Sequence, residues 1–290
     1  MLMSATVDNH LGELHNAVQT TQGVVHQVRL EDRQTRIKNW LSPAEASNNY
    51  NNALQQRFDG TSQWFIKSEV FISFKEGNMP FLWLNGIPGC GKTVLSSSII
   101  EDLQQTSSDA TSTTLYFYFD FNDSRKQTLD DSLRSLLWQA AIRPGNISKE
   151  LEQLYSSCKE GKDQPSTQGL TESFEKTLGA LDRTTIVLDA LDECTSRPVL
   201  LDWLARLARR ETKNTRTIVT SRREHDIESE FEKWLPEKAT IPLQPLDLDI
   251  DIGTYVHSRL RTDPQLERWR NSPEIQEEIE AKLIGKANGM

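Results

Sequence analysis

The sequence predicts an α/β fold: a mainly parallel sheet with helices on both faces, followed by the start of a helical domain. Two observations predict this arrangement. Between residues 81 and 245, short apolar runs alternate with longer amphipathic stretches. Strands that alternate with helices form a parallel sheet wound on both faces. From residue 246 onward, only the helical pattern continues.

The chain divides into four predicted segments. Residues 1–41 form an N-terminal helical segment, and residues 42–80 form a linker that leads into the first strand. Within that linker, residues 42–63 are rich in Ser, Asn and Gln and are expected to be irregular. Residues 81–245 form the α/β domain, and residues 246–290 form the start of a truncated helical domain.

The N-terminal segment carries apolar residues at intervals of three and four, which predicts a helix over residues 10–41. The heptad positions a and d are occupied by Leu11, Leu14, Val18, Thr21, Val25 and Val28. This stripe has two readings that the sequence does not separate. One is a helix packed on its own domain, and the other is a short coiled-coil linker to another segment.

The remaining elements follow from apolar runs and amphipathic periodicity. The predicted strands cover residues 81–85, 114–121, 185–189, 216–220 and 239–243. The predicted helices cover residues 92–105, 129–142, 149–158, 171–181, 199–208, 252–260 and 273–284.

Composition excludes several classes of function. The 290 residues carry a formal net charge of −9, which argues against nucleic acid as the main partner. The three cysteines lie far apart, so neither a disulfide framework nor a zinc site is expected. The sequence contains no signal peptide pattern and no apolar run long enough for a membrane span. We therefore expect a cytoplasmic protein.

A phosphate-binding loop is the most specific motif in the sequence. Residues 86–93 read GIPGCGKT and match the Walker A pattern GxxxxGK[ST]. An apolar strand precedes the motif and a helical stretch follows it. Glycines let the backbone amides turn toward phosphate oxygens, and the helix N-terminus adds a favourable partial charge. The motif predicts binding of ATP or GTP together with Mg²⁺.

Three positions of the loop have an expected role. Lys92 is expected to contact the β- and γ-phosphates, and Thr93 to ligate Mg²⁺. Cys90 is interpreted as a filler position and not as a nucleophile. The predicted nucleotide-binding residues are Gly86, Ile87, Pro88, Gly89, Cys90, Gly91, Lys92, Thr93 and Val94.

Acidic residues follow a second apolar strand. Residues 184–189 end in Asp189, and Asp192 and Glu193 come directly afterwards. Because parallel strands end at one edge of the sheet, these carboxylates are expected to lie beside the phosphate loop. Asp189 is the predicted Mg²⁺ ligand with Thr93. Glu193 is the predicted catalytic base, with Asp192 as a supporting residue or an alternative base.

A third strand, residues 216–220, leads into Ser221, Arg222 and Arg223. The end of this strand should reach the same edge. Arg222 is predicted to sense the third phosphate, and Arg223 is the alternative for that role.

These motifs, in this order, resemble the NACHT NTPases of fungal incompatibility and ankyrin-containing proteins, which are also classified with the nephrocystin-type N-terminal domain. A small residue after the Mg²⁺ aspartate, here Ala190, followed by paired acids is distinctive of the NACHT Walker B motif. The resemblance extends over residues 36–290. The segments that carry it are RIKNWLSP (36–43), GTSQWF (60–65), FLWLNGIPGCGKTVL (81–95), LYFYFDFNDSRKQ (115–127), IVLDALDEC (186–194) and TSRR (220–223).

The resemblance implies a switch of the STAND type: a slow NTPase in which ATP binding is coupled to opening and to self-association through the NACHT domain. It also implies that Trp64 lies near the base of the nucleotide, although a core anchor is an equal reading of this residue. The alternative is a nucleotide-dependent assembly module with negligible turnover. A small-molecule kinase is a third hypothesis, but the lack of an obvious acceptor-binding lid and the NACHT-like Walker B motif argue against it. The sequence contains no NKxD-like base reader, which favours ATP over GTP.

Overall fold

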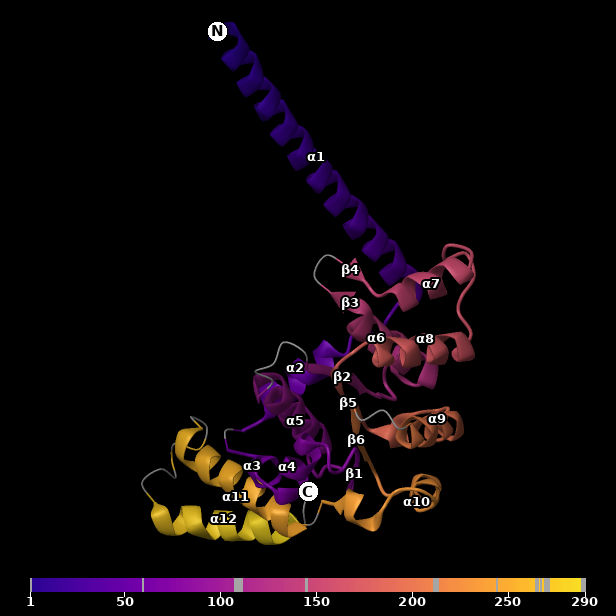
Figure 1. Cartoon of the computed structure of the whole chain (residues 1–290). Helices are drawn as coiled ribbons and strands as arrows, with labels where there is room; N and C mark the ends of the chain where they lie inside the picture. Colours follow the sequence, from indigo (N-terminus) through magenta and orange to yellow (C-terminus); the bar gives the residue numbers. More distant parts are fainter. Residues whose placement is uncertain are drawn as a thin grey trace. The chain divides into compact units, whose positions relative to one another are not determined.

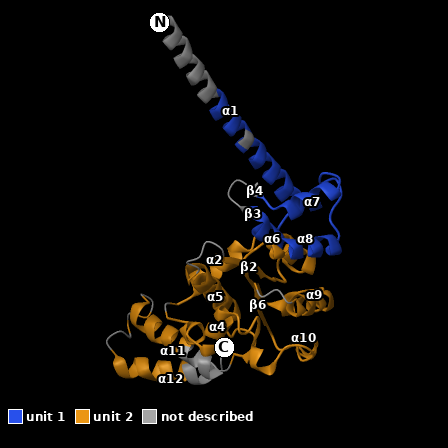
Figure 2. Ribbon diagram, in the orientation of Figure 1, with its two compact units in different colours: residues 1–43, 137–177 blue, residues 44–136, 178–290 orange. Residues whose placement is uncertain are grey.

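A computed structural model describes residues 2–58, 60–106, 112–143, 146–210, 214–243, 245–263, 266, 268 and 272–287. The chain forms two compact units (Figure 2). Unit 1 combines residues 1–43 with residues 137–177, and unit 2 combines residues 44–136 with residues 178–290. Helices α6 (Leu129–Ala141) and α8 (Thr167–Gly179) have residues in both units.

Unit 1 is organised around the C-terminal end of α1 (Leu2–Leu41) and α7 (Lys149–Ser157). The indole of Trp40 packs edge-on against Tyr155, with ring centroids 5.1 Å apart, and donates a hydrogen bond to the carbonyl of Asp163. Arg33 forms ion pairs with Glu152 and Glu160. A short hairpin, β3 (Ile142–Arg143) and β4 (Asn146–Ile147), precedes α7.

The heptad stripe of α1 does not pack within the part of the chain whose side chains are described. Val18, Val25 and Val28 are 51%, 43% and 58% exposed, while Ile37, Trp40 and Leu41 near the end of the helix are buried. Leu11 and Leu14 lie outside the described side chains. The final turns of α1 therefore anchor the helix in unit 1, whereas Val18, Val25 and Val28 are exposed to solvent.

Unit 2 contains a five-stranded, all-parallel sheet with the strand order β2-β5-β6-β1-β7 (Figure 1). The strands are β1 (Phe81–Asn85), β2 (Ser112–Tyr118), β5 (Arg183–Asp189), β6 (Thr215–Ser221) and β7 (Thr240–Pro242). Every residue of β1 is buried, as expected for a strand covered on both faces. The five strands predicted from apolar runs are confirmed, with ends shifted by up to three residues.

The strand register brings the carboxyl ends of the central strands to one edge. Tyr118 lies opposite Asp189, and Asn85 lies opposite Ser221. The loops that follow these strands therefore meet at this edge. All the motifs predicted to bind nucleotide are in these loops.

Helices cover both faces of the sheet, as predicted. Figure 1 shows α5 (Lys92–Thr106) on one side and α9 (Arg197–Arg209) with α10 (His225–Phe231) on the other. Leu200, Leu204 and Leu207 form the buried face of α9. After the last strand, α11 (Pro245–Thr262) packs against α12 (Pro273–Ala287), which confirms the predicted helical character of this segment. None of the described helices is both long and apolar enough to span a bilayer.

One prediction was wrong: residues 42–63 are not irregular throughout. Residues Ser47–Gln56 form helix α2, which packs against α5. Asn and Ser are weak helix formers, so local propensity argues against this helix. Burial of Ala53 against the domain supplies tertiary support that the composition does not reveal. Two short helices, α3 (Gln63–Ile66) and α4 (Glu69–Glu76), then lead into β1.

Candidate functional site

The predicted phosphate loop connects β1 to α5, and its backbone requires glycine. Gly89 and Gly91 both have φ near 78°, in the left-handed region that other residues avoid. At Gly86 the constraint is space, because an added Cβ would lie 2.7 Å from the sulfur of Cys90 and 3.2 Å from Leu243. The loop can therefore turn sharply between a buried strand and the first turn of a helix.

Lys92 lies across this loop. Its ammonium group donates hydrogen bonds to the carbonyl oxygens of Gly86 (2.9 Å) and Ile87 (2.8 Å) and lies 3.6 Å from the sulfur of Cys90. Cys90 itself is buried. The predicted residues from Gly86 to Val94 are thus contiguous around the start of α5, with the positive charge of Lys92 inside the turn.

Asp189 lies at the carboxyl end of β5 and accepts hydrogen bonds from three hydroxyl groups. Thr93 donates to Oδ2 at 2.7 Å, while Ser96 and Thr220 donate to Oδ1 at 2.6 Å and 2.7 Å. The carboxylate is only 2% exposed. Burial raises the pKa of Asp189, and the three hydroxyls oppose that rise by stabilising its charge. The structure therefore brings the two predicted magnesium ligands, Thr93 and Asp189, into direct contact.

The residue after this aspartate turns the chain toward the site. Ala190 has φ 59° in the left-handed region, and its backbone N–H donates to the hydroxyl of Thr220 at 3.0 Å. This conformation is strained for bulky side chains, so a small residue suits the position. The turn leads directly into a single 3-10 turn, Leu191–Glu193, that carries the two following acids.

Asp192 and Glu193 differ in how their carboxylates are used. Both oxygens of Asp192 contact Arg222: Oδ2 lies 3.0 Å from the guanidinium Nε, and Oδ1 accepts from the backbone N–H at 2.9 Å. Glu193 accepts one bond at Oε2, from the backbone N–H of Phe121 at 3.0 Å. Burial, followed by the charges of Asp192 and other acids nearby, raises the pKa of Glu193.

The two predicted phosphate-sensing arginines also differ. The guanidinium group of Arg222 pairs with Asp192, at the edge where the predicted site residues gather. Arg223 instead pairs with Glu228 on α10, with its Nε 2.7 Å from the carboxylate. Of the two, Arg222 is therefore placed with the other predicted site residues.

Asp192, Glu193 and Arg222 line a common open hollow of about 690 Å³. Arg197 also lines it and forms an ion pair with Asp226 at 2.8 Å. Charges of both signs thus gather at the carboxyl edge of the sheet. This arrangement places the three predicted catalytic residues together.

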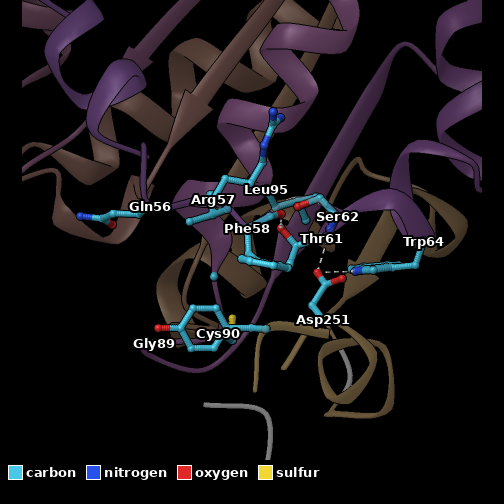
Figure 3. Close-up of a pocket in the computed structure, with 13 residues that line it drawn as sticks. Gln56, Arg57, Phe58, Thr61, Ser62, Trp64, Gly89, Cys90, Leu95 and Asp251 are labelled. Atoms are coloured by element: carbon cyan, nitrogen blue, oxygen red, sulfur yellow. Dashed lines mark hydrogen bonds between the residues drawn. The ribbon is translucent and has the colours of Figure 1, made fainter. Parts of the chain in front are cut away.

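A second cavity, of about 180 Å³, lies beside the phosphate loop (Figure 3). We call it the aromatic pocket, because Phe58, Trp64 and Tyr255 line it, together with Cys90, Leu95 and Asp251. Three separate parts of unit 2 contribute: residues 56–64, residues 89–95, and the middle of α11, with Asp251 and Tyr255. Trp64 lines the pocket and also packs edge-on against the buried Phe65. Its expected place near the base of a nucleotide remains a prediction.

Asp251 is the acidic residue of the aromatic pocket. Its Oδ2 accepts hydrogen bonds from the backbone N–H of Ser62 (2.8 Å) and from the indole N–H of Trp64 (3.2 Å), as Figure 3 shows. No ion pair of Asp251 occurs among the described residues. Burial raises the pKa of Asp251, while the bonds from Ser62 and Trp64 oppose that rise.

Sequence reasoning missed the roles of Ser96, Thr220 and Asp251. A signal existed for Ser96, because it lies three residues after Thr93 and so on the same face of α5. Thr220 was identified only as the end of a strand. Nothing in the sequence distinguishes Asp251 from other acids near it, because the pocket forms only when α11 meets residues 56–64.

The chain is similar in sequence to known proteins. The family described as "Nephrocystin 3, N-terminal" matches residues 60–222. The vegetative incompatibility protein HET-E-1 of Podospora anserina is 27% identical over 232 residues, which is 78% of this chain. The chain spans only 17% of the length of that protein.

Solved structures show weaker likeness. Cdc6p from Pyrobaculum aerophilum aligns with a TM-score of 0.42 and 15% identity, over 74% of this chain and 52% of that one. A structure of Drosophila ORC bound to AT-rich DNA and Cdc6 aligns with a TM-score of 0.33 and 10% identity, over 88% of this chain and 41% of that one.

Proposed function

The chain belongs to the nephrocystin 3 N-terminal family and is a NACHT-type P-loop protein, and from this premise we propose that it binds ATP with Mg²⁺, hydrolyses it slowly and acts as a signalling switch. In this proposal, the ATP-bound form opens and self-associates through unit 2. The observation that carries the proposal is the direct contact of Thr93 with Asp189 beside the phosphate loop.

Phosphate binding is assigned to the loop and to Lys92. In the structure the ammonium group of Lys92 contacts two carbonyl oxygens and the sulfur of Cys90, which are weaker partners than a phosphate. A triphosphate placed on the loop would exchange these contacts for charge-assisted bonds. The amides of the loop and of the first turn of α5 would add further donors.

The donor set suits Mg²⁺. Thr93 Oγ1 and Asp189 Oδ2 are hard oxygen ligands, 2.7 Å apart, and Mg²⁺ in nucleotide sites is held by one or two protein oxygens plus phosphates and water. Held by Thr93 and Asp189, the ion would supply positive charge that stabilises the charge developing on the phosphates. Ser96 and Thr220 would then hold Asp189 in place.

Hydrolysis is assigned to Glu193. Both oxygens of Asp192 are engaged by Arg222, whereas Glu193 has a single hydrogen-bond partner among the described residues. Its raised pKa suits a group that must take a proton from water. Asp192 then has a positioning role, because it holds Arg222 near the predicted site of the third phosphate.

The proposed switch is a change in the populations of a closed and an open conformation when ATP binds. A ligand can move a conformational equilibrium only through different affinities for the two states. ATP and ADP differ by the third phosphate, and Arg222, held at the sheet edge by Asp192, is the proposed group that responds to it.

The proposal is tested by equilibrium binding of ATP with and without Mg²⁺, combined with sedimentation in ATP and in ADP. Lys92→Ala should weaken ATP binding by about 100-fold or more, because a charge-assisted phosphate contact is lost. Lys159→Ala is the matched control, since Lys159 is exposed and pairs only with Asp163 among the described residues. Unchanged affinity in Lys92→Ala would defeat the phosphate-loop assignment. An identical sedimentation coefficient in ATP and ADP would defeat the switch.

A further inference from the structure

The aromatic pocket contains one feature that phosphate binding does not use. Asp251 is a half-buried carboxylate among aromatic and aliphatic side chains, with no ion pair among the described residues. Arg57, the basic residue lining the same pocket, is paired with Glu101 instead. An acceptor without a cation in an apolar pocket is suited to a neutral donor group.

The two oxygens of Asp251 are not equivalent. Oδ2 accepts from Ser62 N–H and Trp64 Nε1, which occupies both of its lone pairs. Oδ1 has no hydrogen-bond partner in the part of the chain that the structure describes. The contact with Ser62 also holds a turn, because Ser62 is buried with φ 66° in the left-handed region. One oxygen therefore fixes the local backbone, and the other remains available to a ligand.

We propose that Asp251 is a specificity-determining residue that accepts a hydrogen bond from the 6-amino group of an adenine base seated in the aromatic pocket. This inference rests on the proposed nucleotide site, because the pocket and the phosphate loop share Gly89, Cys90 and Gly91. Phe58, Trp64 and Tyr255 supply apolar and aromatic surface for a planar ring.

The choice of adenine follows from the single available oxygen. Adenine carries an amino group at position 6, which donates a hydrogen bond. Guanine carries a carbonyl oxygen at the same position, which only accepts one. That carbonyl would face a carboxylate oxygen and repel it. The adjacent N–H donors of guanine are matched by a carboxylate with both oxygens available, and Oδ2 is already occupied.

The test compares three triphosphates in competition with a fluorescent ATP analogue, in the presence of Mg²⁺: ATP, GTP and purine riboside triphosphate, which has the adenine ring without its amino group. The wild-type chain should bind ATP about 10- to 100-fold more tightly than purine riboside triphosphate, as expected for one hydrogen bond to a charged acceptor.

Asp251→Asn is the informative variant. The amide oxygen can still accept from Ser62 and Trp64, while its NH₂ group replaces the free oxygen by a donor. The ATP preference over GTP should therefore be lost or reversed. Asp202→Asn, an exposed aspartate on α9 that pairs with Arg206, controls for the change of charge. A thermal melt of each variant checks that it folds.

The outcomes separate the two proposals. Equal affinity of the wild-type chain for ATP and purine riboside triphosphate would overturn the role of Asp251, even if Asp251→Asn does not fold. An unchanged ATP-to-GTP ratio in a folded Asp251→Asn variant would overturn it as well. If no triphosphate competes with the analogue, the proposed nucleotide site fails and this inference fails with it.

Discussion

The phosphate loop region and the aromatic pocket treat a buried carboxylate in different ways. Asp189 is almost fully buried, and three hydroxyls donate to its two oxygens. Asp251 is half-buried, and only its Oδ2 has partners among the described residues. Both oxygens of the first carboxylate are held by hydroxyl donors. The second carboxylate, that of Asp251, has one oxygen, Oδ1, without a hydrogen-bond partner among the described residues.

In the two proposals, Asp189 serves phosphate chemistry and Asp251 serves selection of the base. Chemistry on phosphates requires ligands fixed before the nucleotide arrives, because preorganised groups need no rearrangement during the reaction. Selection of a base requires an acceptor whose satisfaction depends on the ligand, because an unpaired buried polar group penalises the wrong base.

The largest effect is expected at Glu193. Glu193→Gln removes the proposed base without changing its volume, so single-turnover hydrolysis should fall by about 10² to 10⁴. Binding of ATP and Mg²⁺ should persist, because Lys92, Thr93 and Asp189 are unchanged. Asp189→Asn is the contrasting variant and should first weaken the Mg²⁺-dependent part of binding. A wild-type rate in Glu193→Gln would exclude Glu193 as the base and make Asp192 the next candidate.

The pH dependence of hydrolysis should report the same group. A general base acts only when deprotonated, and burial raises the pKa of Glu193 above that of an exposed glutamate. The single-turnover rate should therefore fall in acid by about tenfold per pH unit below that pKa. The fall should begin at a higher pH than an ordinary glutamate would give. A rate that stays constant down to the ordinary glutamate range would contradict the assignment.

A medium effect is expected in the hydroxyl cluster around Asp189. Ser96→Ala removes one donor to a buried carboxylate and should lower the free energy of unfolding by about 1–3 kcal/mol. Ser98→Ala is the matched control, because Ser98 is also buried on α5 but donates only to the carbonyl of Val94 among the described residues. Urea unfolding of both variants measures the difference. An equal decrease in the free energy of unfolding for both variants would show that the hydrogen bond from Ser96 to Asp189 adds no extra stability.

The smallest effect is expected at Arg222. Its side chain is 45% exposed, so a contact with the third phosphate should contribute about 3- to 10-fold in affinity. Arg222→Ala should weaken ATP binding by that factor and leave ADP binding nearly unchanged. Arg223→Ala, which breaks a pair with Glu228, should affect neither nucleotide. Equal losses for ATP and ADP in Arg222→Ala would assign the residue to structure or to another phosphate.

The same comparison explains what the sequence predicts well. The central strands β1 and β5 contain continuous apolar runs, FLWL and IVL, so burial on both faces is visible directly in the sequence. The loop around Lys92 and the acids after Asp189 are consecutive residues whose spacing defines their chemistry. Their meeting at one edge then follows from the parallel order of the strands. Strands of this kind were predicted correctly, whereas the roles of the site residues remain predictions.

Features that depend on tertiary contact were not predicted. Helix α2 contains mostly Asn, Gln and Ser, and it is stabilised by packing on α5. Asp251 gains its environment only because α11 reaches Ser62 and Trp64, nearly 190 residues earlier in the chain. Neither case leaves a local pattern, since the cause is a contact between segments distant in sequence. The aromatic pocket was therefore only indicated, through Trp64, by the family resemblance.

In both proposals, one nucleotide occupies the phosphate loop and the aromatic pocket together. Hydrogen–deuterium exchange with and without saturating ATP and Mg²⁺ tests this claim most directly. We expect slower exchange in three separate stretches: residues 86–94, residues 56–64 and residues 251–255. Inorganic triphosphate with Mg²⁺ should protect the first stretch alone. Protection by ATP that is absent from residues 86–94, or confined to them, would contradict the account.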